Sequence, residues 1–197
     1  MDKLRHGPRR GWFGLSARLL LLTVFFVMLS EVFIYAPSIG RFRVTYLQER
    51  IAASHLASLA LDATPDNMVG DALRRALLDH AGVHGIMLKR PSSKALILSN
   101  HMPSAVDKSF DLAQGSFFGL IGDAFETMLM TRDRALRILA RSPKDPATTI
   151  EIVLSERPMR AAMVRYSLNI LGVSIVISLM TAVLVFLSLQ WLFVRPM

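Results

Sequence analysis

The stretch Tyr166–Val194, YSLNILGVSIVISLMTAVLVFLSLQWLFV, contains no charged residue in 29 positions, and it decides the fold. A helix needs about 20 apolar residues to cross the roughly 30 Å hydrocarbon core of a bilayer. A second stretch, Leu19–Gly40, has 22 residues and one charge, Glu31. Both stretches therefore predict transmembrane helices. The resulting segments are a basic tail at 1–18, helices at 19–40 and 166–194, a domain at 41–165 and a short end at 195–197.

The distribution of charge predicts how the chain is oriented in a membrane. The formal net charge is +8, and residues 1–18 contribute half of it through five Lys/Arg and one Asp. Basic segments beside a transmembrane helix remain in the cytoplasm. We therefore expect a multi-pass protein of the bacterial inner membrane, with both termini cytoplasmic and 41–165 outside. The lipid bilayer, and not nucleic acid, is the partner that this charge indicates.

Composition and motifs exclude several classes of protein. Hydrophobic residues make up 52% of the chain, which argues against disorder. There is no Cys, which excludes a disulfide scaffold, a thiolate zinc site and a Cys nucleophile. No nucleotide-binding, zinc-protease or serine-hydrolase motif occurs. His80 and His84 have a spacing that would suit a metal on one helix, but the helix-breaking Gly82 separates them. From this and from the missing motifs we predict no metal, cofactor or catalytic residue in this chain. Scattered acidic residues are expected to be solvated: Asp107, Asp111 and Asp123.

The middle of the chain predicts a small α+β domain. Turn residues and short aliphatic runs indicate strands, whereas apolar residues at i, i+3 and i+4 indicate helices. The expected helices are 41–62, a second from Thr64 and Pro65 to His80 closed by a left-handed Gly82, 116–130, and one capped by Ser155 that continues unbroken into the second span. The expected strands are 84–90, 94–99, one within 106–112, 134–141 and 148–155. Together these form a small antiparallel sheet with flanking helices between two transmembrane helices.

Small residues follow one another at helical spacing along 41–62. They are Ala53, Ser54, Ala57, Ser58 and Ala60. Small side chains allow two helices to approach closely. They indicate either a parallel dimer contact or packing within the domain itself, and the sequence does not separate these alternatives.

Two groups of polar residues are candidates for ligand binding and for coupling. Arg137 and Arg141 share one face of the strand 134–141, where they could capture an anionic ligand, although a solvated sheet face is the alternative. Glu31 is the only ionisable residue within a span, and such residues are costly and often functional. We expect it to hydrogen-bond near Ser174, Ser178 and Thr181 or to a second subunit. The alternative is a rotated helix with Glu31 at the outer headgroups.

The ends of the chain resemble the input half of a bacterial transmembrane sensor histidine kinase of two-component systems. One matching stretch is Leu19–Arg43, with the run SEVFIYAPSI at 30–39. The other is Ile150–Met197, where EIVL at 151–154 and RAAM at 160–163 precede the second span. Arg195 and Pro196 look like the opening of a HAMP linker. The element order between the spans is similar to a PAS-like (PDC/CACHE-type) sensor domain.

This resemblance implies a homodimer that senses a periplasmic stimulus. ATP, Mg²⁺ and the response-regulator partner would belong to a cytoplasmic kinase that is absent from these 197 residues. Two alternatives stay open. The chain could be the input module of a chemoreceptor or a diguanylate cyclase, or it could be a stand-alone two-span accessory membrane protein.

Overall fold

The computed structural model describes residues 15–62, 70–90, 93–99, 106–112, 115–141 and 147–193. These residues fall into two compact units. One unit comprises Ala36–Ser167, and the other contains the described residues up to Tyr35 together with those from Leu168 onward.

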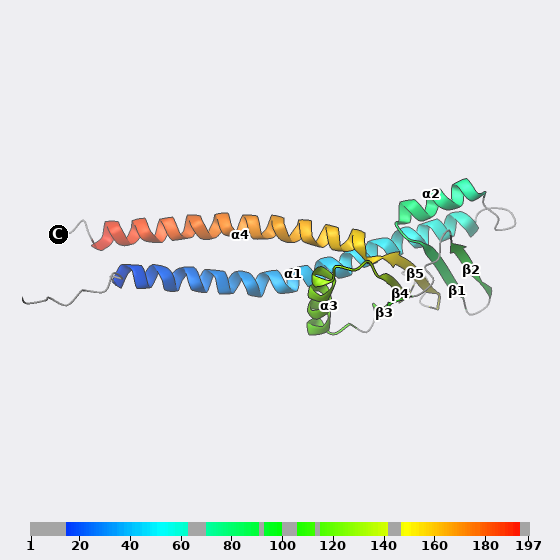
Figure 1. Cartoon of the computed structure of the whole chain (residues 1–197), viewed down its shortest axis with the longest axis horizontal. Coiled ribbons are helices and arrows are strands. Elements are labelled where there is room, and N and C mark those ends of the chain that lie inside the picture. Colours follow the sequence, from blue (N-terminus) through cyan, green and yellow to red (C-terminus); the bar gives the residue numbers. More distant parts are fainter. Residues whose placement is uncertain are drawn as a thin grey trace, which may run out of the picture. The chain divides into compact units, whose positions relative to one another are not determined.

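The order of elements agrees with the prediction of a small sheet domain between two long helices (Figure 1). The elements are α1 (Leu15–Asp62), α2 (Asp71–Ala81), β1 (Gly85–Arg90), β2 (Ser93–Ser99), β3 (Lys108–Asp111), α3 (Phe117–Leu129), β4 (Ala135–Arg141), β5 (Thr149–Ser155) and α4 (Glu156–Phe193).

The two long helices are apolar and expose their apolar side chains. α1 has 48 residues and continues through Pro37, and α4 has 38 residues. Phe33 of α1 is 71% exposed, and Val176 of α4 is 65% exposed. Each helix contains a segment that is long and apolar enough to cross a membrane. The chain therefore has two helices of membrane-spanning length, as predicted.

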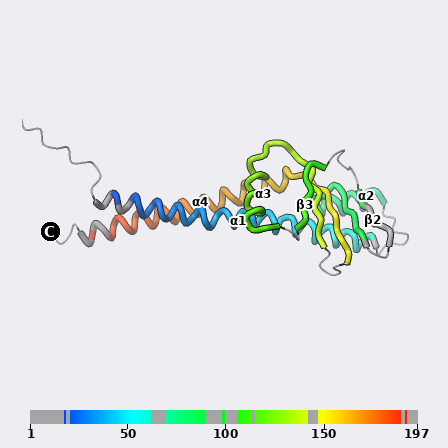
Figure 2. The backbone as a smooth tube through the Cα atoms, turned by 90° about the horizontal axis from the view of Figure 1, so that it is seen from below, coloured from blue at the N-terminus to red at the C-terminus, as the bar shows by residue number. Residues whose placement is uncertain are grey.

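The five strands form one mixed sheet in the order β2-β1-β5-β4-β3 (Figure 2). β1 is antiparallel to β2 and β5, and β4 is antiparallel to β5. β3, however, is parallel to β4. The prediction of a wholly antiparallel sheet is wrong at this edge, because α3 lies between β3 and β4 in the chain and acts as the crossover that a parallel pair requires.

One face of the sheet forms the core of the domain. Because opposite residues of paired strands point to the same side, Ile152 shares this face with Ile86 and Ile138. Leu47 and Ile51 of α1 are buried in the same core. The sheet residues of this face that are at most 4% exposed are Ile86, Leu88, Leu98, Leu136, Ile138, Ile150, Ile152 and Leu154.

α2 ends as predicted, at Gly82. It starts at Asp71 after the non-helical Gly70, whereas the predicted start at Thr64 and Pro65 lies outside the described residues. Gly82 adopts a left-handed conformation with φ +66°. The Val83 amide donates to the Leu78 carbonyl over 3.1 Å, which completes the hydrogen bonding typical of a glycine-terminated helix.

The small residues of α1 pack mainly within their own domain. Ser54, Ala57 and Ser58 are at most 5% exposed. They therefore do not provide a dimer surface, which answers the question that the sequence left open for these three positions. Leu56, which is 67% exposed, and Ala60 face away from this packing.

The predicted cap of α4 is present. The Ser155 hydroxyl accepts a hydrogen bond from the Arg157 amide over 3.3 Å and donates one to Asp133 Oδ1 over 2.7 Å. Satisfying a free amide of the first turn stabilises the start of a helix. The helix that leads to the second apolar segment is thus fixed directly at the end of β5.

Candidate functional site

Six charged side chains from α1, β3, α3, the residue before β4, and the start of α4 gather within the unit Ala36–Ser167. We call them the charged cluster. Its members are Arg43, Lys108, Asp123, Glu126, Arg134 and Glu156.

Arg134 lies at the centre of the charged cluster. Its Nε and Nη2 donate to Glu156 Oε2 and Oε1 over 2.6 and 2.9 Å, and its Nη1 donates to Glu126 Oε1 over 2.7 Å. The Thr127 hydroxyl also donates to Glu156, over 2.8 Å. Paired arginine–carboxylate bonds of this kind fix orientation as well as contributing energy. Arg134 therefore holds α3 and the first residue of α4 in one arrangement.

α3 contributes an acidic pair to the cluster. Lys108 Nζ of β3 donates to Asp123 Oδ1 over 3.1 Å and to Glu126 Oε2 over 2.8 Å. The hydrogen bond from Arg134, reinforced by that from Lys108, lowers the pKa of Glu126 to about 2. Hydrogen bonds to both carboxylates raise the pKa of Lys108, although burial opposes this shift. Glu126 is therefore ionised at neutral pH.

Arg43 connects α1 to the cluster less tightly. It is only 1% exposed, yet its Nη1 is 3.9 Å from Asp123 Oδ2, which is long for an ion pair. Its Nε and Nη2 are buried and have no hydrogen-bond partner among the described residues. The guanidinium lies 4.2 Å from the centroid of the Phe110 ring. Burial lowers the pKa of Arg43, although Asp123 and Glu156 counteract this effect.

The charged cluster connects α3 to α4 more tightly than it connects α3 to α1. Arg134 joins α3 to α4 through short hydrogen bonds, whereas Arg43 joins α1 to α3 through a long contact and an aromatic ring. A buried charge without full hydrogen bonding is costly, so the contact of Arg43 stabilises the arrangement less than the bonds of Arg134 do. The cluster can therefore act as a mechanical joint between helices.

One acidic residue expected to be solvated has charged partners instead, because Asp123 pairs with Lys108 and Arg43. Asp107 is exposed as predicted, and its Oδ2 also accepts from the Ala135 amide over 2.8 Å. The prediction was wrong for Asp123 because the crossover brings β3 and α3 beside β4, which the spacing of the acidic residues does not reveal.

The predicted ligand residues Arg137 and Arg141 lie on β4, on the face opposite the core. Arg137 Nε is 2.6 Å from Glu151 Oε1, without the N–H alignment of a hydrogen bond. Glu151 is only 4% exposed, and Lys89 Nζ lies 3.4 Å from it. Burial tends to raise the pKa of Glu151, but the two cations lower it overall. An anionic ligand would have to compete with Glu151 for Arg137, while Arg141 is exposed at the end of the strand.

The predicted coupling residues lie in the other unit. Ser178 Oγ donates to Glu31 Oε1 over 2.5 Å, so the structure brings these two side chains together. Ser174, one turn earlier on α4, is half-buried. The predicted HAMP junction, Arg195 and Pro196, lies outside the described residues.

No three His, Asp or Glu side chains gather as a metal site in the part of the chain that the structure describes. Comparison of the chain with family models, with curated proteins and with solved structures gives no significant match.

Most of the charged cluster was not predicted from the sequence, although two signals indicate it. Arg43 falls in a series of buried residues spaced by four on α1, with Ile39, Leu47 and Ile51. A single charge in such a series indicates a buried ion pair. Asp123 and Glu126 are three residues apart and thus share one face of α3.

Proposed function

We propose that the chain is the signal-input module of a membrane-bound two-component sensor histidine kinase. In this proposal a stimulus acts on the PAS-like domain outside the bacterial inner membrane. Its effect passes through α4 and a HAMP linker to a cytoplasmic kinase that uses ATP and Mg²⁺ and that phosphorylates a response regulator. The observation that carries the proposal is the continuity of α4, which begins at Glu156 directly after β5 and is helical to Phe193.

The charged cluster supplies the element that a stimulus would bias. Small changes at one site are amplified only where a packed interface has two discrete arrangements. Glu156 is both a member of the cluster and the first residue of α4, so any movement of Arg134 acts on the end of a rigid helix. Arg43 ties α1 to the same group of charges. The domain thus controls both long helices at one joint.

The proposal includes a homodimer with both termini cytoplasmic. The exposed face of α1 that carries Leu56 and Leu59 offers an apolar surface to a second copy. Apolar patches of this kind on a folded domain often mark interfaces. The basic tail at 1–18 supports the cytoplasmic placement of the N-terminus.

A chimera tests transmission. Residues 1–197 would replace the input half of a sensor kinase whose autophosphorylation can be assayed in isolated membranes. The two parts would be joined at the HAMP linker. We expect Arg134→Ala to change the basal kinase activity, because it removes the guanidinium that joins Glu156 to Glu126 and leaves Glu156 attached to α3 through Thr127 alone. We expect a Gly-Gly insertion after Arg165, which interrupts α4, to make the activity insensitive to Arg134→Ala.

Arg74→Ala, in an exposed pair on α2, is the matched control and should leave kinase activity unchanged. Kinase activity that responds to Arg134→Ala equally with and without the insertion would contradict the helical lever. A folded chimera whose activity ignores Arg134→Ala altogether would contradict the role of the cluster.

A further inference from the structure

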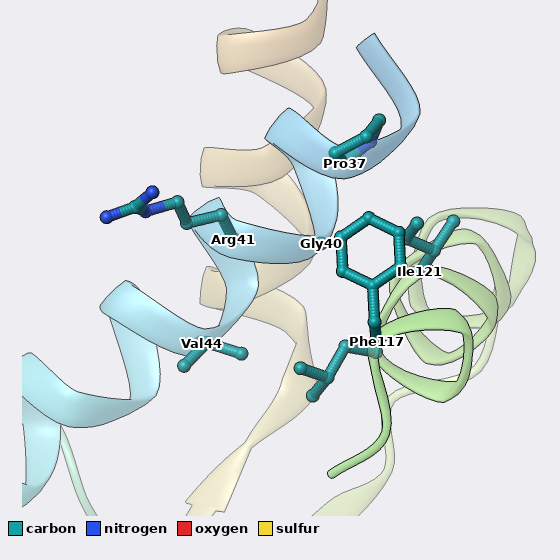
Figure 3. Close-up of a pocket in the computed structure, with 7 residues that line it drawn as sticks. Pro37, Gly40, Arg41, Val44, Phe117 and Ile121 are labelled. Atoms are coloured by element: carbon teal, nitrogen blue, oxygen red, sulfur yellow. The ribbon is translucent and has the colours of Figure 1, made fainter. Parts of the chain in front are cut away.

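An apolar pocket of about 330 Å³ lies between α1 and α3 (Figure 3). Its walls include Pro37, Gly40 and Val44 of α1 and Phe117 and Ile121 of α3. A pocket of this volume falls in the range of small-molecule sites. All of these residues belong to the unit Ala36–Ser167, so the pocket is a feature of the domain itself.

The pocket adjoins the point where the apolar stretch of α1 ends. Gly40 is the last residue of the uncharged run after Glu31, and Arg41 is the first charge beyond it. Arg41 also lines the pocket, but Figure 3 shows its guanidinium directed away from Phe117 and Ile121. Its aliphatic stem therefore borders the pocket while its charge faces outward. Arg41 is exposed and forms no ion pair with any described residue.

α3 exposes aromatic rings beside the pocket. Phe117 is 58% exposed and Phe118 is 82% exposed. Two adjacent exposed phenylalanines on a folded domain indicate an apolar partner. Residues 41–44 directly follow a membrane-spanning stretch, so on the proposed topology these rings meet the outer headgroup region, where amphipathic and aromatic side chains gather.

We propose that this pocket binds an anionic phospholipid of the outer leaflet, with part of an acyl chain between α1 and α3 and the phosphate on Arg41. The assignment rests on the membrane insertion proposed above. An acyl chain matches the apolar walls, and a phosphate matches the unpaired guanidinium, which binds such oxygens in a planar fork. The pocket continues the apolar stretch of α1, so a lipid can enter it from the bilayer.

Occupancy of the pocket acts on the charged cluster through α3. A Cβ placed on Gly40 would lie 3.3 Å from Ile121 Cγ1, so the two helices are already close at the base of the pocket. The same helix α3 carries Asp123, whose contact with Arg43 is the weakest in the cluster. Lipid bound between α1 and α3 changes their separation, and hence the contact between Arg43 and Asp123.

The test uses the full chain in lipid nanodiscs with two photoactivatable probes. Phosphatidylglycerol and phosphatidylcholine would carry the same diazirine-bearing acyl chain, and labelled peptides would be mapped by mass spectrometry. We expect phosphatidylglycerol to label the peptides that contain 37–44 and 117–121. Val44→Trp, which fills the pocket, should abolish this labelling, whereas Leu73→Trp on the exposed face of α2 should not.

The exposed Arg41 gives a second variant that leaves the fold intact. Arg41→Gln should reduce the preference for phosphatidylglycerol over phosphatidylcholine by roughly threefold, the scale of an exposed charge pair. Both lipids offer a phosphate, so Arg41 discriminates between them only because the choline of phosphatidylcholine offsets the phosphate charge. Arg75→Gln on α2 is the control and should retain the preference. Equal labelling by both lipids in the unaltered chain, or labelling of 37–44 and 117–121 that Val44→Trp leaves unchanged, would overturn the site.

Further results distinguish a second copy of the chain from lipid as the occupant, and distinguish failure of the lipid site from failure of the signalling proposal. If Phe118→Cys forms a disulfide-linked dimer in place of lipid labelling, the pocket holds a second copy and the lipid site is overturned. A chain that transmits in the kinase chimera but takes up no lipid overturns the lipid site alone. Labelling in a chain whose chimera does not transmit supports the lipid site and contradicts only the signalling role.

Discussion

Replacing Arg134 by Met should strongly destabilise the sheet domain. Arg134 and Glu156 have side-chain exposures of 15% and 2%, so the substitution leaves a carboxylate buried without its cation. Removing one partner of a buried pair costs about 3–5 kcal/mol. Glu156 keeps the Thr127 hydroxyl and lies in the first turn of α4, where negative charge is favoured. We therefore expect the lower end of this range, about 3 kcal/mol.

Hydrogen exchange measured by mass spectrometry on the full chain reports this loss directly. The most protected amides of β4 and β5 exchange through opening of the domain, so their rates follow its free energy. A loss of about 3 kcal/mol accelerates exchange by roughly two orders of magnitude, since 1.4 kcal/mol corresponds to about a factor of ten. Tryptophan fluorescence is unsuitable because the sequence between residues 36 and 167 contains no tryptophan.

Two further variants separate the buried charge from other effects. Arg134→Met combined with Glu156→Gln should restore most of the protection, because the amide carries no charge and still accepts from Thr127. Arg74→Met removes an exposed pair with Asp71 and should cost about 0–1 kcal/mol. If Arg134→Met accelerates exchange no more than Arg74→Met, or if the double variant is less protected than Arg134→Met alone, the reasoning is refuted.

Three other changes give distinct outcomes. Arg43→Met should leave protection unchanged or increased, because it removes a buried and poorly hydrogen-bonded charge while Asp123 keeps Lys108; a large loss in exchange experiments would show that Arg43 is well satisfied. The pKa of Glu126 is lowered to about 2, so the stability that its ionised carboxylate gives the domain is complete above about pH 4.5 and is lost as the pH falls toward 2. In thermal denaturation between pH 7 and pH 3, Glu126→Gln should therefore lose less stability than the unaltered chain. Identical pH profiles for the two proteins would contradict the pairing of Glu126 with Arg134 and Lys108. Glu31→Gln keeps an acceptor for Ser178, so kinase activity in the chimera should be unchanged, and a large change would show that the charge itself matters.

The sequence predicted what depends on local pattern. The apolar runs, the strand-forming segments, the Gly82 turn and the Ser155 cap each follow from neighbours within a few residues, and the structure shows them. The parallel edge pair was not predictable in this way, because β3 and β4 pair across the whole of α3. The charged cluster was not predictable for the same reason, since its members Arg43 and Glu156 are far apart in the chain.

The predicted anion site shows a second limit on what a sequence pattern can predict. Strand periodicity correctly places Arg137 and Arg141 on one face, but it does not reveal that Glu151 lies on the adjacent strand within 2.6 Å of Arg137. Cross-strand partners depend on register, which a single strand pattern does not fix.

The placement of the termini tests the account most directly. The chain contains no Cys, so single cysteines can be introduced at Lys3, at Asp79 on α2 and at Met197 without background. A membrane-impermeant maleimide applied to intact spheroplasts should label Asp79→Cys alone, with Lys3→Cys and Met197→Cys reacting only after permeabilisation. Labelling of either terminal cysteine in intact spheroplasts, or removal of the first apolar stretch from the mature protein, would contradict the account.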